Sequence, residues 1–149
     1  MSGSRQRASS ARRRARKFLV QALYQWQVSG DDPGDVLIQF VDGRNLGNAD
    51  IEYFRELMRA IPADVAGLDA RIAPLLERSV AMVDPVERGI LRLGCYELRD
   101  RLEVPARVVI DEAVELAKAF GAEQSHRFVN GVVDRLARGL RPREFGRTG

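Results

Sequence analysis

The chain has 149 residues, a length that suits one domain with a sizeable buried core. One cysteine and one histidine exclude both an intramolecular disulfide and a structural zinc site. The net charge of +3 is unevenly distributed, because residues 1–30 hold seven basic residues and no acidic one. Residues 31–149 hold 17 basic and all 21 acidic residues, a net charge of −4, so a basic N-terminus precedes a mildly acidic body.

The N-terminal residues 1–11 are small, polar and basic, a composition that predicts a disordered arm. A helix is predicted to begin near Arg12 or Arg13, because apolar residues then recur with helical spacing as far as Trp26. Tyr24 and Gln21 lie off this apolar face. An Arg- and Ser-rich start is also typical of a mitochondrial transit peptide, an alternative that is disfavoured because the apolar face resembles core.

Three helical patterns follow: one over Asp35–Val41, one that Asn48 or Asp50 can cap and that breaks or kinks at Pro62, and one from Val65 to Leu76. The segment Asp84-Pro85-Val86-Glu87 then predicts a helix start, since Asp84 can cap the helix and proline suits its first position.

The stretch from Val104 to Leu136 predicts an antiparallel pair of helices joined by a short connector. Gly121 is expected to end the first helix in a left-handed conformation, and Ser125 to cap the second. Gly131 inside the second helix favours close helix–helix approach, with contact to a ligand as the alternative. Residues 139–149 are predicted to form a flexible tail. No strand pattern is found, so the expected fold class is all-α, with about seven helices.

No catalytic motif is present: the sequence contains no P-loop, no nucleophile elbow and no dinucleotide-binding fingerprint. We therefore expect no enzyme activity, no metal and no cofactor. No apolar run approaches the length of a membrane span, so no membrane association is expected. Arginines neutralise phosphates and an exposed tyrosine can stack on unpaired bases, so the N-terminus predicts binding to nucleic acid, with RNA favoured over DNA. A solubilising tail is the alternative.

Three segments of the sequence are distinctive in combination: RRRARKFLVQALYQW at Arg12–Trp26, VDPVERGILRLGCYEL at Val83–Leu98 and VVIDEAVELAKAFGAEQSHRFVNGVVDRL at Val108–Leu136. Together they resemble the NusB family of bacterial transcription antitermination factors. The resemblance runs from Arg12 to Arg138 and implies one RNA-binding domain, residues 12–138, built of two small helical bundles.

The resemblance also implies a function. Members bind the boxA element of nascent RNA as a single strand, together with the ribosomal small-subunit protein NusE. The complex joins other Nus factors on RNA polymerase and suppresses termination, notably in ribosomal RNA operons, which implies a cytoplasmic protein. Some members form homodimers, so a homodimer is a further expectation. NusB-like domains also occur fused to RNA methyltransferases, but this chain is too short to carry such a catalytic domain.

The resemblance implies two sets of site residues. The partner-binding surface for NusE is expected around Glu87, with Arg88 and Leu91 on the same helix. Phe128 is open to two interpretations, contact with RNA or packing in the core. Gln124 stands where many members have an acid, and an amide removes a repulsion against phosphate. The expected RNA-binding residues are Arg12, Arg13, Arg14, Arg16, Gln21, Tyr24, Gln124, Arg127 and Phe128.

Overall fold

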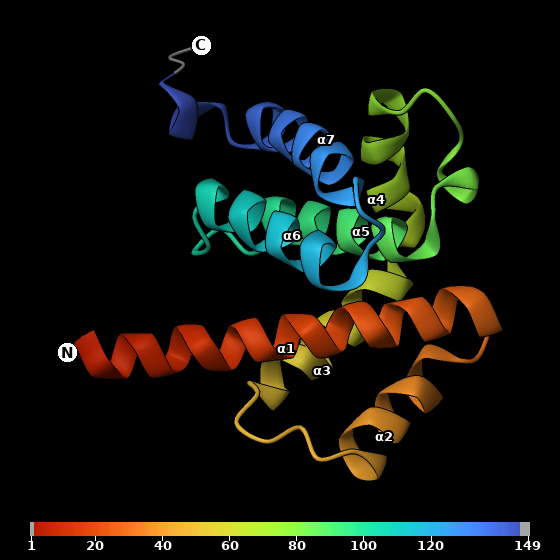
Figure 1. Ribbon diagram of the computed structural model, residues 1–149, viewed down its shortest axis with the longest axis vertical. Helices are drawn as coiled ribbons and strands as arrows, with labels where there is room; N and C mark the ends of the chain where they lie inside the picture. Colours follow the sequence, from red (N-terminus) through yellow and green to blue (C-terminus); the bar gives the residue numbers. More distant parts are fainter. Residues whose placement is uncertain (1, 147–149) are drawn as a thin grey trace. The chain divides into compact units, whose positions relative to one another are not determined.

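The computed structural model of the chain describes residues 2–146, without the side chain of Ser2. Over that range the chain forms seven α-helices and three short 3-10 helices and contains no strand (Figure 1). The backbone divides into two compact units, Met1–Ala63 and Asp64–Gly149. The predicted class, all-α with two small helical bundles, is confirmed. The sequence did not predict that the boundary between the units follows Ala63.

The first unit consists of three helices that contact one another in every pair, α1 (Ser2–Ser29), α2 (Pro33–Gly43) and α3 (Ile51–Ala63). Asp32 begins α2 by accepting a hydrogen bond from the Gly34 amide at 2.8 Å, with proline at the first helical position. The apolar faces of the three helices supply the buried core, and its largest members are Leu19, Leu23, Phe40, Phe54, Leu57, Met58 and Ile61.

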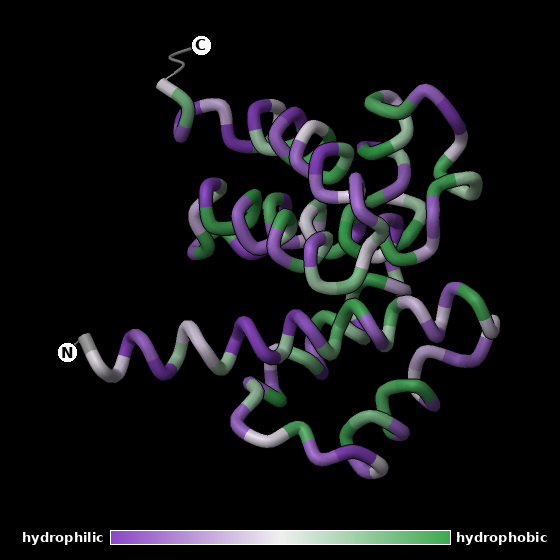
Figure 2. The backbone as a smooth tube through the Cα atoms, viewed as in Figure 1, coloured by the Kyte–Doolittle hydropathy of each residue, from purple (hydrophilic) through white to green (hydrophobic). Residues whose placement is uncertain are grey.

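Helix α1 begins at Ser2, about three turns earlier than the sequence predicts. Met1 lies outside the described residues, and residues 3–9 are exposed and mostly hydrophilic (Figure 2). The prediction of a disordered arm at residues 1–11 therefore differs from the structure. The physical reason is local: residues 2–11 contain no proline, and Arg, Gln and Ala are good helix formers. A hydrogen bond from the Asp50 amide to the Ala11 carbonyl, 2.9 Å long, joins this part of α1 to the loop before α3.

The second unit is organised around its central helix, α5. All ten residues from Gly89 to Leu98 are buried, because helices α4, α6 and α7 all pack against α5. A helix buried on every side belongs to a core. The elements of the unit are α4 (Val65–Ile72), η1 (Ala73–Leu75), η2 (Val80–Met82), α5 (Pro85–Asp100), α6 (Ala106–Phe120), α7 (Ser125–Leu140) and η3 (Pro142–Phe145).

The start of α5 is confirmed. Asp84 Oδ1 accepts hydrogen bonds from the amides of Val86 and Glu87, at 2.9 and 3.3 Å. Further along α5, a Cβ atom at Gly94 would lie 3.6 Å from Val133 of α7, so glycine here marks a closely packed helix pair. The α6–α7 hairpin that surrounds this point is also present as predicted.

The two ends of the α6–α7 connector differ from the prediction. Gly121 has φ −91° and ψ 177°, which is extended and not left-handed. Glycine is needed there for space, since a Cβ atom would lie 2.7 Å from the Ser125 Cβ and 2.8 Å from the Ala117 carbonyl oxygen. Ser125 is the first residue of α7 and not its cap. Its hydroxyl donates a hydrogen bond to Glu87 Oε2 at 2.6 Å, which links α7 to the start of α5.

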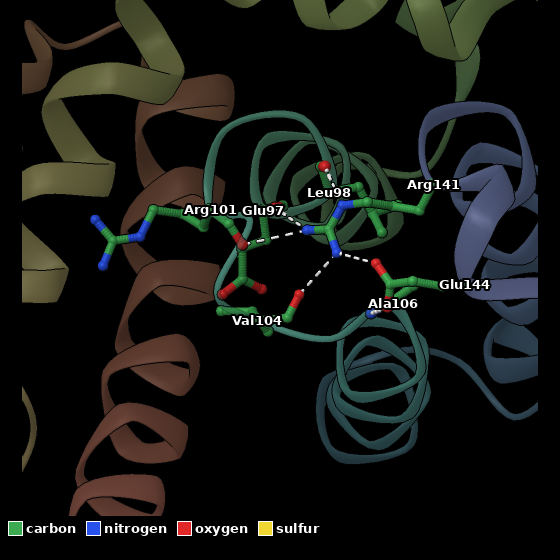
Figure 3. Close-up of polar contacts among 7 residues, drawn as sticks. All are labelled: Glu97, Leu98, Arg101, Val104, Ala106, Arg141 and Glu144. Atoms are coloured by element: carbon green, nitrogen blue, oxygen red, sulfur yellow. Dashed lines mark hydrogen bonds and ion pairs between the residues drawn. The ribbon is translucent and has the colours of Figure 1, made fainter.

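The C-terminal segment also differs from the prediction of a flexible tail at residues 139–149. Helix α7 continues to Leu140, and Arg141 is buried, with 7% of its surface exposed. Its guanidinium donates to four backbone carbonyls at the end of α5 and in the α5–α6 connector (Figure 3). It also forms an ion pair with Glu144 at 2.6 Å. These contacts hold η3 in place as far as Gly146, and residues 147–149 lie outside the described range.

Glu144 makes part of the stability dependent on pH. Hydrogen bonds from the Ala106 amide and then from Arg141 lower the pKa of Glu144 below its ordinary value of 4.5. A lowered folded-state pKa means that the carboxylate contributes fully above that ordinary value and less as the pH falls through the folded-state pKa. We expect Glu144→Gln to lower stability at neutral pH and to flatten its acid dependence. Urea denaturation at pH values from about 7 to about 3 checks this, and equal pH dependence in both proteins would contradict it.

Candidate nucleic-acid interface

The four arginines at residues 12–16 point in different directions around α1. The guanidinium of Arg12 lies 4.0 Å from the centre of the Tyr53 ring and 3.9 Å from the Asp50 carboxylate. Arg16 is 4% exposed, with its guanidinium 5.8 Å from the same ring. Both therefore face α3. A buried Arg16 cannot reach a phosphate without moving, so the structure does not place it among exposed contact residues.

A different face of α1 combines exposed charge with an exposed aromatic ring. Arg13, Lys17, Gln21 and Tyr24 follow one another at spacings of three and four residues, which places them on one side of the helix. Arg13 and Lys17 are exposed, and Tyr24 keeps 43% of its surface exposed. The Gln21 amide is held by hydrogen bonds to the Lys17 carbonyl and from Arg44. We call these four residues the α1 face; Lys17 was not among the predicted site residues.

Arg14 lies beside a shallow groove of about 660 Å³ between the first turns of α1 and the loop residues Asn48 and Ala49. Arg7 lines the same groove. Arg7 and Arg14 are seven residues apart, two turns of helix, and so project to the same side of α1. This groove adds two exposed cations to the N-terminal half of the helix.

In the second unit, the predicted residues lie at the start of α7. Gln124 and Arg127 are exposed, and Gln124 occupies the position before the helix without capping it through its side chain. Phe128 is half-buried and is not part of the core. It lines a groove of about 400 Å³ between α7 and residues 75–78, together with Arg127. The guanidinium of Arg78 lies 5.5 Å from the centre of the Phe128 ring.

Sequence reasoning missed Arg78 and Arg135, which both line this groove. Arg135 could have been found, because residues 124, 128, 131 and 135 recur at helical spacing along α7. Arg78 could not, since it lies in the irregular segment between η1 and η2. The favoured interpretation of Gly131, close helix approach, is not supported: a Cβ atom there would meet nothing within 4 Å.

Comparison with known proteins identifies the family. The model of the NusB family matches residues 13–138. The chain belongs to the NusB family. The transcription antitermination protein NusB of Alcanivorax borkumensis is 50% identical over 132 residues, 89% of this chain and 88% of that protein. The solved structure of T. maritima NusB has a TM-score of 0.79 and 33% identity, and the match covers 91% of this chain and 97% of that one.

A second solved structure contains ligands. It is a complex of the antitermination factors NusB and NusE with double-stranded RNA. Its matching chain has a TM-score of 0.77 and 32% identity, with 87% of this chain and 98% of that chain covered. At this TM-score, identity and coverage, the two chains share the same fold.

The residues expected to face a partner in this NusB-family chain do not form one exposed surface. Glu87 is half-buried and accepts the hydrogen bond from Ser125. Arg88 donates to the Ala81 carbonyl at 3.1 Å, while its Nε is buried without a hydrogen-bond partner among the described residues. Burial, and then the charge of Arg92, lower the pKa of Arg88. Leu91 is 1% exposed and lies in the core, so it can only support the surface from beneath.

Within residues 2–146, no group of three or more metal-binding side chains comes together. No helix in this range has the length and apolar character needed to cross a bilayer. Cys95 is buried on α5, where burial raises the pKa of its thiol to about 11. A thiol with so high a pKa stays protonated at neutral pH and is a poor nucleophile.

Proposed function

We propose that this chain binds the boxA element of nascent RNA as a single strand, together with the ribosomal protein NusE, and acts in transcription antitermination. In this proposal it works in the cytoplasm with other Nus factors on RNA polymerase, notably on ribosomal RNA operons, by binding and not by catalysis. Membership of the NusB family supports the proposal, as does the relative solved with NusE and RNA. The observation that carries it is the α1 face, where exposed cations flank an exposed tyrosine.

The α1 face has the groups that an unpaired strand requires. Arg13 and Lys17 can neutralise phosphates, and the exposed ring of Tyr24 can stack on a base. The Gln21 amide lies between them and can reach a base edge. Arg12 and Arg16 serve this face indirectly, because their contacts with the Tyr53 ring fix α1 against α3.

The start of α7 offers a second set of groups. Gln124 and Arg127 are exposed, and neither carries a negative charge that would repel phosphate. Phe128 is half-exposed at the groove beside them, so the interpretation as an RNA contact is favoured over packing in the core. Each of the two surfaces is proposed to bind RNA.

The test is RNA binding as a function of salt. We expect a boxA oligonucleotide to bind more tightly than a scrambled one, and NusE to increase this preference. If Arg13, Arg14, Lys17 and Arg127 each contact one phosphate, these four contacts together contribute about −3 to the slope of log K against log salt. Fluorescence anisotropy at several salt concentrations measures both quantities. Equal affinity for the two oligonucleotides, or a slope near zero, would contradict the proposal.

The partner surface can be tested at Glu87. We expect Glu87→Lys to weaken NusE binding about tenfold or more, because it reverses a charge and removes the acceptor of the Ser125 hydroxyl. Glu115→Lys, an equal charge change at an exposed position of α6, is the control. Calorimetric titration with NusE compares the two, with circular dichroism to verify the helix content. If Glu87→Lys binds NusE with the same affinity as the control, Glu87 does not belong to the partner surface.

A homodimer remains a prediction of the family resemblance. Sedimentation of the free protein, repeated with boxA RNA, tests it. A dimer that RNA dissociates would indicate that self-association covers the RNA-binding surface, whereas a monomer at all concentrations would contradict the prediction.

A further inference from the structure

The groove beside α7 is lined by several arginines and one aromatic ring. It lies between α7 and residues 75–78, with a volume of about 400 Å³, within the range of small-ligand sites. Arg78, Arg127 and Arg135 line it, against a single carboxylate, Glu77. Phe128 supplies an aromatic wall. The groove therefore combines an excess of positive charge with a flat apolar surface.

Gly131 keeps this groove open. A glycine in the interior of a helix destabilises that helix relative to alanine. Nothing in the packing requires it, because a Cβ atom would meet no atom within 4 Å. Gly94 shows the contrast, since a Cβ atom there would touch Val133 and Val109. The empty space over Gly131 opens into the groove, so the glycine leaves room for something outside the described chain.

We propose that this groove is a subsite for one nucleotide of the bound RNA. The base stacks on Phe128 and lies over Gly131, while Arg78 and Arg135 hold the adjoining phosphates. This inference rests on the proposed function and adds to it three residues, Arg78, Gly131 and Arg135. We assign a nucleotide because its base supplies a flat ring and its phosphate an anionic group, the two features that the groove complements, and because RNA is the proposed ligand.

Arg78 has two tasks in this arrangement. Its guanidinium, 5.5 Å from the Phe128 ring centre, approaches the ring that a base would stack on and so limits the ring's movement. Guanidinium groups also form bidentate contacts with phosphate. Arg135 lies two turns of α7 beyond Phe128, on the same side of the helix, and can bind a phosphate at the other end of the groove.

The first experiment fills the groove. We expect Gly131→Leu to weaken boxA binding about tenfold, because it removes the space for the base, and to leave the thermal midpoint unchanged or higher. Gly139→Leu is the matched control, since Gly139 also lies on α7 with nothing within 4 Å of a Cβ atom, yet does not line the groove. If Gly131→Leu does not fold, Gly131→Ala replaces it, with a smaller loss of affinity and a raised midpoint. Unchanged boxA affinity in the folded Gly131 variant would overturn the subsite.

The second experiment counts phosphate contacts. Arg78→Gln should make the salt slope about 0.7 less steep, the value of one phosphate contact on a single strand. Arg107→Gln, at an exposed position of α6 outside the groove, should leave the slope unchanged. An Arg78→Gln slope equal to that of wild type would contradict the phosphate contact. If the wild-type protein binds boxA and the groove variants bind it equally well with the same salt slope, the subsite is refuted but the proposed function is not. If the wild-type protein does not bind boxA, the proposed function itself is refuted.

Discussion

Replacing Arg141 with methionine should lower the free energy of unfolding by about 3–4 kcal/mol. The side chain is buried, and its donors satisfy the carbonyls of Glu97, Leu98, Arg101 and Val104 at distances of 2.8–3.2 Å. Three of these carbonyls belong to the last turn of α5 and the residue after it, where the helix dipole is negative. Methionine is also unbranched and apolar but has no donor, so the carbonyls would lose their hydrogen bonds inside the fold and the exposed Glu144 would lose its cation. Urea denaturation followed by circular dichroism measures the loss.

Two further variants show how much of the stability comes from the several hydrogen bonds of the guanidinium and how much from its positive charge. Arg141→Lys retains the positive charge but cannot reach four carbonyls at once, so it should recover less than half of the loss. Arg143→Met, at an exposed position two residues away, should change stability by less than about 0.5 kcal/mol. If Arg141→Met and Arg143→Met were equally stable, Arg141 would not be the group that fixes the end of α5.

Replacing Tyr24 with alanine should weaken RNA binding about 5- to 150-fold, the range for one lost base stack. The fold should be unaffected, because Tyr24 keeps 43% of its surface exposed and does not belong to the buried core. The affinity for boxA RNA, measured by fluorescence anisotropy, should therefore fall while the thermal midpoint stays the same.

Two control variants show whether any loss of affinity comes from the lost base stack on Tyr24 or simply from the removal of exposed apolar surface. Tyr24→Phe keeps the ring and should bind within about twofold of wild type. Ile38→Ala removes a similarly exposed apolar side chain from α2, with 57% exposure, and should not change the affinity. A Tyr24→Ala protein that binds as tightly as Ile38→Ala would exclude stacking on this ring.

Local patterns in the sequence predicted much of the fold. The capping segment from Asp84 to Glu87 gave the start of α5 correctly, and helical spacing with a short connector gave the α6–α7 hairpin. Both depend on interactions between residues a few positions apart, and such interactions can be derived from one sequence.

The errors concern interactions between distant residues. The tail was predicted to be flexible because nothing nearby in sequence shows that Arg141 reaches the end of α5, more than 40 positions away. Gly121 was assigned a left-handed conformation, whereas its role is to leave space for Ser125.

The candidate site was predicted only in part. The sequence indicates which residue types can bind RNA, but it indicates less well on which side of the helix each side chain lies. Tyr24, Arg13, Gln124 and Arg127 are exposed, as a contact residue must be, whereas Arg16 is buried although it belongs to the same run of arginines. Helical spacing would have separated Arg12 and Arg16 from Arg13, since residues four apart share a side and adjacent residues do not. The groove at Gly131 could not be predicted from the sequence, because one of its walls comes from an irregular segment whose position no local pattern gives.

Ultraviolet crosslinking of boxA RNA to the protein, followed by mass spectrometry of the crosslinked residues, tests the proposed interface most directly. We expect crosslinks at Tyr24 on the α1 face and at Phe128 in the α7 groove, both reduced by competition with unlabelled boxA RNA. Crosslinks confined to other residues, with Tyr24 and Phe128 unmodified in an RNA complex of normal affinity, would contradict the proposed interface.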